Sequence, residues 1–239
     1  MQTATYVALS RQTVLGRSMD VIANNLANMS TTGFKSETPL FQEYLQAGPK
    51  GQTISYVRDI GVVRDGRSGD LSSTGNPLDI GINGGGYFQV NTTDGPRYTR
   101  NGRFQIDSGR NLVTAQGNQV LNSAGQPITI PQGATSISIG ADGSVATETG
   151  PVGKIALTSF ANEQDLVAAG NGLYATSATP IPDTTSTMHQ GFLEQSNVQP
   201  IIALTQLQAV QSSYTMAQNI IEGEDNRLRN AIDKLSKSA

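Results

Sequence analysis

Apolar residues recur at helical spacing at both ends of the chain, whereas its middle lacks that period. Near the C-terminus, one row repeats every seven positions and consists of Leu207, Tyr214, Ile221, Leu228 and Leu235. A second row is offset by three or four residues and consists of Ala203, Val210, Ala217, Glu224 and Ala231. Two such rows correspond to the a and d positions of a heptad repeat, so they predict a long helix with a coiled-coil seam.

The N-terminal segment shows the same pattern over a shorter length. Its row consists of Ala8, Leu15, Ile22 and Met29, with Met19 and Leu26 beside it. The pattern predicts an amphipathic helix over about residues 3–29, which ends before Gly33 because glycine adopts the left-handed conformation that follows a helix cap. Three asparagines are unusual within this helix, since Asn competes for backbone hydrogen bonds. We expect them to fix the register of an interface; they are Asn24, Asn25 and Asn28.

The pattern in the middle of the chain predicts first a connector and then strands. Residues 34–70 are irregular and contain only two short β-like runs, so they predict an extended connector. From residue 71 to 195, short alternating segments are separated by turn sequences such as Asp94–Gly95, which predicts an all-β domain. The predicted class is therefore α+β. A helical domain of residues 1–33 with 196–239 would form a coiled-coil layer beside a central β domain of residues 71–195.

Composition argues against several classes of function. The 239 residues carry a net charge of −3, and only 15% of them are charged, so there is no basic field for nucleic acid or an anionic membrane. Cysteine is absent, which excludes disulfides and thiolate chemistry. No apolar run approaches the length of a transmembrane helix, and the first residues lack the features of a cleaved signal peptide.

The candidate catalytic residues favour structural roles. His189 is the only histidine, and we expect it on the surface of a loop without metal or triad partners. The glycines at positions 84–86 lack the spacing and the lysine of a phosphate-binding loop, and they predict a hairpin turn. Asp65, Asp70 and Asp79 flank turns without the spacing of a calcium loop. We therefore expect no catalytic, metal or cofactor site.

The two helical rows have two interpretations. A stripe at helical spacing commonly packs on the core of its own domain. Rows at both ends of a chain whose middle is of another structural class favour packing between subunits instead. The expected assembly residues are Ala8, Leu15, Met19, Ile22, Asn24, Asn25, Leu26, Asn28, Leu207, Val210, Tyr214, Ala217, Ile221, Leu228 and Leu235.

Four segments, in order along the chain, carry a resemblance to a known family. Residues 21–28 (VIANNLAN) with 30–35 (STTGFK), residues 76–90, residues 98–104 (YTRNGRF) with 112–117, and residues 191–198 (GFLEQSNV) are similar to the motifs of bacterial flagellar rod and hook proteins. The short length and the C-terminal sequence, residues 222–235, most resemble the proximal-rod members.

The resemblance implies a non-enzymatic axial subunit without cofactors. Its terminal helices would form an inner coiled-coil tube, and its β domain would form the outer layer of the shaft. Its partners would be copies of itself, other proximal and distal rod proteins and the flagellar type III export apparatus. It would lie in the periplasmic rod of the basal body, exported without a cleaved signal. Two alternatives are a distal-rod or hook-type axial protein, and an envelope hydrolase with helical oligomerisation arms.

Overall fold

The computed structural model describes residues 2–47 and 53–237 and divides the chain into two compact units. The first, here called the terminal unit, comprises Met1–Ala27, Glu37–Val63 and Gln199–Ala239. The second, the β unit, comprises Asn28–Ser36 and Arg64–Val198. The α+β class is confirmed, since helices lie at both ends of a β-rich region. The coiled-coil layer remains a prediction.

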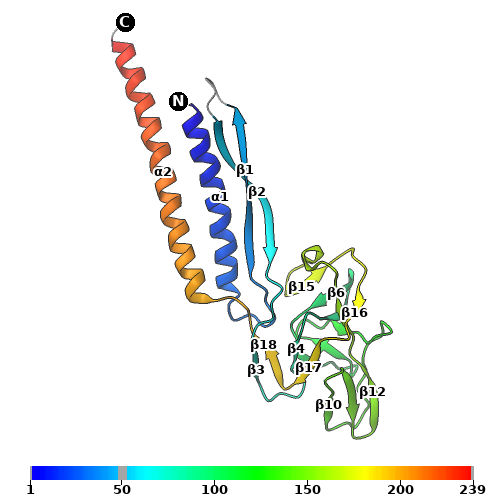
Figure 1. The fold of residues 1–239 in the computed structure, drawn as a ribbon. Coiled ribbons are helices and arrows are strands. Elements are labelled where there is room, and N and C mark those ends of the chain that lie inside the picture. The colour runs from blue at the N-terminus through cyan, green and yellow to red at the C-terminus, as the bar shows by residue number, and fades with distance from the viewer. Residues whose placement is uncertain (1, 48–52, 238–239) are drawn as a thin grey trace. The chain divides into compact units, whose positions relative to one another are not determined.

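The terminal unit consists of two helices and a pair of long strands. Its helices are α1 (Gln2–Ala27) and α2 (Pro200–Lys237), and its strands are β1 (Glu37–Ala47) and β2 (Thr53–Arg64). Helix α1 contacts both α2 and β1, and the two strands run in opposite directions (Figure 1).

The two strands differ from the extended connector expected over residues 34–70. Large apolar residues occur on both sides of β1, for example Leu40 with Phe41 and Tyr44 with Leu45, so the alternation that marks a half-buried strand is missing. Pairing with β2 satisfies the backbone groups that the sequence pattern left unassigned. The paired strands are here called the hairpin.

Helix α1 buries two stripes, and the heptad pattern predicts only one of them. The predicted row contains Ala8 and Ile22, which are both buried. A second stripe, about a quarter turn away, consists of Val14, Ser18, Val21 and Asn25, all buried. It escaped notice because Ser and Asn interrupt its apolar character.

The β unit contains short strands and one 3₁₀ helix. The strands are β3 (Leu71–Ser73), β4 (Ile80–Asn83), β5 (Tyr87–Thr92), β6 (Gly95–Thr99), β7 (Phe104–Ile106), β8 (Leu112–Thr114), β9 (Gln119–Val120), β10 (Ile137–Ile139), β11 (Ser144–Thr147), β12 (Gly150–Lys154), β13 (Leu157–Ser159), β14 (Val167–Ala168), β15 (Leu173–Ala175), β16 (Ile181–Pro182), β17 (Thr187–Gln190) and β18 (Phe192–Glu194). The 3₁₀ helix η2 (Glu163–Asp165) is capped by Asn162.

The strands pair in an antiparallel fashion in several small sheets. The main path runs β14-β15-β6-β5-β9-β8-β7, with β13 and β16 joined to it through β5. Strands β10, β11 and β12 form a separate sheet, and the pairs β17–β4 and β18–β3 complete the unit. The interior is apolar, with Ile80, Ile82, Phe88 and Val90 fully buried, as their alternation predicted.

The glycines at positions 84–86 do not form the hairpin turn expected from the sequence. Strand β4 pairs with β17, while β5 pairs with β6, so the segment connects two different sheets. The Gly84 and Gly86 carbonyls accept hydrogen bonds from the guanidinium of Arg100.

Candidate assembly site

Most residues of the predicted rows on α1 and α2 are buried or half-buried, and the two helices contact each other. On α1, Leu15, Met19 and Leu26 are half-buried beside the buried Ala8 and Ile22. On α2, Ala217 is buried, and the half-buried members are Leu207, Val210, Tyr214 and Ile221. At Gly16, a Cβ atom would lie 3.9 Å from the Tyr214 ring, an ordinary van der Waals distance, so the two helices are in contact there.

The end of the α2 row lies beyond the helix that covers its beginning. Helix α2 has 38 residues and α1 has 26, a difference of about 18 Å in length. Leu228 is accordingly 41% exposed and Ile232 is 64% exposed. The side chain of Leu235, the last predicted member of the row, lies outside the described residues.

The three asparagines of the α1 segment occupy different environments. Asn25 is buried and forms a two-way pair with the backbone of Glu37: its Nδ2 donates to the carbonyl at 2.7 Å, and the Glu37 amide donates to Oδ1 at 2.9 Å. Asn24 is exposed on α1. Asn28 belongs to the β unit, where its side chain accepts a hydrogen bond from Thr31. Asn25 therefore sets a register within one chain, between α1 and β1.

Much of α2 presents an uncharged surface. Residues 200–221 contain no Asp, Glu, Lys or Arg. Besides the predicted row, a second set of apolar residues lies about 100° around the helix, and its larger members are exposed: Ile202 at 52%, Met216 at 62% and Ile220 at 53%. Exposed helix faces normally carry charged residues, so this surface has the composition of an interface.

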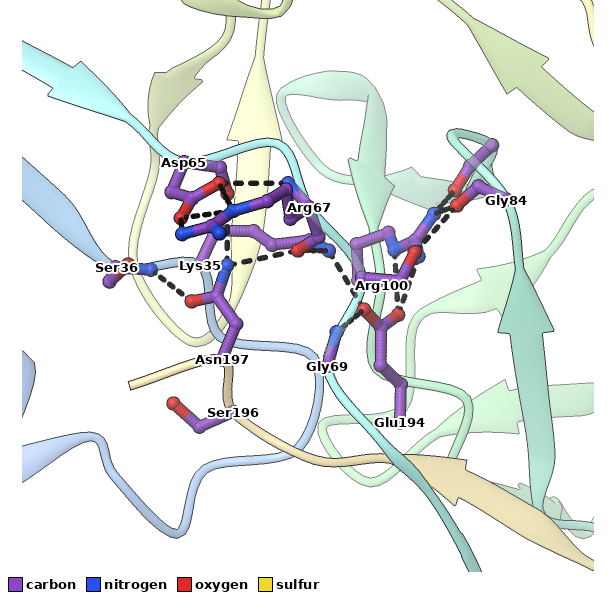
Figure 2. Close-up of polar contacts among 12 residues, drawn as sticks. Lys35, Ser36, Asp65, Arg67, Gly69, Gly84, Arg100, Glu194, Ser196 and Asn197 are labelled. Atoms are coloured by element: carbon purple, nitrogen blue, oxygen red, sulfur yellow. Dashed lines mark hydrogen bonds and ion pairs between the residues drawn. The ribbon is translucent and has the colours of Figure 1, made fainter. Parts of the chain in front are cut away.

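A cluster of three buried charges organises the β unit. Lys35, Arg100 and Glu194 each have side chains that are only 1% exposed. The Lys35 ammonium lies 2.8 Å from Glu194 Oε1, and Arg100 Nε donates to Glu194 Oε2 at 2.8 Å (Figure 2). We call these three residues the charged cluster.

Backbone groups complete the hydrogen bonding of the charged cluster. Lys35 donates to the Arg67 carbonyl at 2.8 Å, and the Gly69 amide donates to Glu194 Oε1 at 3.0 Å. Arg100 donates to the Gly84 carbonyl at 2.8 Å (Figure 2). Burial and the neighbouring Arg100 cation lower the pKa of Lys35, and the Glu194 carboxylate opposes that shift.

Asn197 ties together the segments on either side of the charged cluster. Its Oδ1 accepts from the Ser36 amide at 2.7 Å, and its Nδ2 donates to the Asp65 and Arg67 carbonyls at 3.1 and 2.9 Å (Figure 2). All of these residues belong to the β unit, and they lie close to the positions where the chain passes between its two units. The charged cluster and Asn197 therefore hold together the segments through which the chain leaves the β unit.

Gly33 is fixed by its contact with the same region. Its φ angle is 68°, the left-handed conformation that the sequence predicted. A Cβ atom at this position would lie 2.6 Å from the backbone carbon of Arg100, and the Gly33 amide donates to the Glu194 carbonyl at 2.8 Å. Glycine is required here both for conformation and for space.

The residues considered for catalysis are spread over the β unit. His189 is exposed, but it lies on strand β17 and not in a loop. Asp65 forms an ion pair with Arg67, whose guanidinium lowers its pKa, and Asp79 accepts a hydrogen bond from Asn76. Among the described residues, no group of three or more His, Cys, Asp or Glu side chains is placed to hold a metal ion.

Comparison with known proteins identifies the family. The family model described as "Flagella basal body rod protein" matches residues 6–35, "Flagellar hook protein FlgE/F/G D1 domain" matches 81–147, and "Flagellar basal body rod FlgEFG protein C-terminal" matches 189–234. The chain is 38% identical to the flagellar basal-body rod protein FlgF of Caulobacter vibrioides, over 99% of both chains. It belongs to the flagellar basal-body rod family.

Other relatives agree with this assignment. The chain is 32% identical to FlgF of Rhizobium meliloti, over 100% of both chains. It is also 32% identical to the rod protein FlgG of Bacillus subtilis, over 98% of this chain and 99% of that protein. The chain is thus a structural rod subunit of the flagellar basal body. Within the described residues, neither helix has the length and apolarity needed to span a membrane.

The charged cluster gives the motifs of this rod subunit a physical meaning. Lys35 ends the segment 30–35, Arg100 lies in the segment 98–104, and Glu194 and Asn197 lie in the segment 191–198. Each segment was recognised as a string of residues, and the structure brings their polar members into one buried network. Sequence patterns did not predict this network, because no spacing rule pairs residues separated by 94 and 159 positions.

Proposed function

We propose that the rod subunit occupies the proximal part of the rod and assembles helically through α1 and α2 into a hollow shaft that transmits torque. The observation that carries this proposal is the uncharged surface of α2, which is exposed in one chain. Packing against α2 of further copies would remove its apolar residues from water, at about 25 cal/mol per Å². Contacts that join two different patches of neighbouring copies are heterologous, and they propagate into a helical assembly when they do not close into a ring.

The proposal assigns a coiled-coil layer to the terminal unit. The rows of α1 and α2 supply the contact within a subunit, and the uncovered end of α2 from Leu228 onward would pack on a neighbouring subunit. The proposed interface includes Asn24, which is exposed, whereas Asn25 acts within the chain. The β unit would then form the outer layer of the shaft.

The remaining parts of the proposal concern partners and location. Other rod proteins would lie above and below this subunit, and the flagellar type III apparatus would export it across the inner membrane without cleavage of a signal. Its place in the rod would be periplasmic, and it would catalyse no reaction. The names of the relatives, which are basal-body rod proteins, support the placement in the rod.

Substitution of Met216 tests the role of the α2 surface. Met216→Lys adds a charge to the exposed row without removing a buried contact, so the isolated subunit should keep its helical circular dichroism. The variant should be lost from purified basal bodies, and cells that depend on it should not swim. Met216→Leu, which preserves the apolar character, should assemble normally. Normal rods built from Met216→Lys would contradict the proposed interface.

Electron microscopy of tagged subunits tests the position along the rod. A compact tag on the β unit should appear at the membrane-proximal part of purified basal bodies. Density for the tag near the hook would instead assign the subunit to the distal rod. Mass spectrometry of the protein from the same preparation should show an intact N-terminal segment if export occurs without cleavage.

A further inference from the structure

The acidic residues of the hairpin share one of its two faces, although apolar residues occur on both. Side chains alternate between the two faces of a strand. The Ser55 hydroxyl donates to Glu43 Oε1 across the pair, so the odd-numbered residues of β1 and β2 share one face and the even-numbered residues share the other. The odd face carries the acidic residues Glu37, Glu43 and Asp59, and Asp59 forms an ion pair with Arg17 of α1 at 3.5 Å. The acidic side chains therefore lie on the face turned toward α1.

The even face of the hairpin is apolar and open. Leu40, Tyr44 and Ile60 are 40%, 61% and 54% exposed. Tyr56 lies on the same face, half-buried, and Arg58 is the only charged residue that β1 and β2 place there within the terminal unit. A two-stranded sheet with an open apolar face is marginally stable and prone to association. We therefore expect a partner to cover this face in the assembled protein.

The β unit contains a groove with an apolar lining. Its volume is about 510 Å³, which lies in the range of pockets that enclose small ligands. Its apolar lining includes Ile155, Leu157 and Met188, with Pro180 and Pro182 on the strand β16 side. The groove therefore has room for an aromatic side chain.

The charges of the groove are opposite to that of the hairpin face. Asp142, Asp183 and Lys154 lie on its lining, which leaves one negative charge in excess. Asp142 is engaged by Lys154 at 3.3 Å. Burial opposes ionisation of Asp183, but hydrogen bonds from Ser186 and Thr185 outweigh it and keep its pKa below the usual range. Asp183 is therefore the available partner for a cation.

We propose that the even face of the hairpin docks into the groove of a second copy of this chain, with Tyr44 in the apolar lining and Arg58 facing Asp183. This inference rests on the proposed assembly of the subunit and adds a second interface to it. The two surfaces are different patches, so each copy uses its hairpin on one neighbour and its groove on another. Such a contact is heterologous and continues from copy to copy.

The absence of cysteine from the chain allows a direct test by cross-linking. Two singly substituted chains, Tyr44→Cys and Thr184→Cys, are co-expressed, and basal bodies are purified and treated with a short bismaleimide reagent. Thr184 is exposed and lines the groove. A covalent dimer that contains one copy of each variant is expected. Because each chain carries one thiol, this product cannot arise within a single chain.

Matched controls separate the proposal from other outcomes. Glu43→Cys places the thiol next along the strand but on the opposite face, and it should give no dimer with Thr184→Cys. Adding Arg58→Glu to the Tyr44→Cys chain should lower the yield severalfold, since like charges would then meet. An unchanged yield with Arg58→Glu would contradict the assigned pairing.

Two further outcomes overturn the inference. If both variants are present in the basal bodies but no mixed dimer forms, the docking of hairpin into groove is wrong. If Tyr44→Cys links only to a protein of another mass, the occupant is a different rod protein and not a second copy. If neither variant is found in basal bodies of swimming cells, the proposed function itself fails, and immunoblotting of the same preparation detects that case.

Discussion

The buried carboxylate of Glu194 offers the sharpest test of how the β unit is held together. Glu194→Gln preserves the shape of the side chain and removes its charge. It leaves Lys35 and Arg100, two cations whose side chains are 1% exposed, without the anion that lies between them. Removal of one partner from a buried ion pair costs about 3–5 kcal/mol of the free energy of unfolding. We expect a loss of that size.

Lys35→Met should be less costly than Glu194→Gln. Removal of the Lys35 ammonium leaves one buried cation and one buried anion, because Arg100 still donates to Glu194 at 2.8 Å. The substitution deletes hydrogen bonds from the ammonium to Glu194 and to the Arg67 carbonyl, each with a charged donor. The substitution also removes the cost of burying the ammonium. We therefore expect the free energy of unfolding to decrease by about 1.5–3 kcal/mol.

Urea titrations of the full chain measure both losses, and thermal unfolding provides a check. For a chain of this length, 3–5 kcal/mol corresponds to a decrease in Tm of about 6–20 °C. Asp225→Asn serves as the control, since its pair with Arg229 is exposed and should contribute less than about 1 kcal/mol. A greater loss with Lys35→Met than with Glu194→Gln would refute the reasoning, because it would show that the anion is not the centre of the charged cluster.

Three further variants test local features. Gly33→Ala should destabilise the chain more than Gly75→Ala in urea titrations, because both positions have positive φ angles of 68° and 70° but only Gly33 would bring its Cβ against backbone. Asn25→Ala should speed hydrogen exchange of the Glu37 amide, which loses its acceptor; unchanged exchange would contradict the role of that pair. Hydrogen bonds from backbone N–H groups before β10 lower the pKa of Glu148 to about 2, below the ordinary 4.5. The stability that Glu148 contributes is therefore complete above about pH 4.5 and is lost as the pH falls toward 2. Glu148→Gln should make the free energy of unfolding less dependent on pH across that window, as urea titrations at several pH values would show.

The helices illustrate what periodicity can predict. The heptad rows placed α1 and α2 correctly to within a few residues, because a repeat of about 3.5 residues occurs only when one face of a helix is apolar. The rows did not reveal the second stripe of α1, since Val14, Ser18, Val21 and Asn25 mix apolar and polar side chains. Within that stripe, Asn25 bonds to the backbone of Glu37 in β1, which is a tertiary contact.

The hairpin and the charged cluster lay beyond such patterns for different reasons. The hairpin was missed because its apolar residues occupy both faces, so the period of two was hidden. The charged cluster was missed because Lys35, Arg100 and Glu194 are far apart in sequence and each has the appearance of a surface charge. Burial of these three residues becomes visible only when the segments meet.

The sequence by itself determined the class of this rod subunit, with helices at both ends and strands between, because local periodicity and turn residues act over a few positions. Its ordered motifs also determined the family. Only the tertiary structure decided which polar residues are buried together, which face of the hairpin is open and how Asn25 is used. These depend on long-range packing, where one side chain can be a solvated charge or the centre of a buried network according to what the rest of the chain places around it.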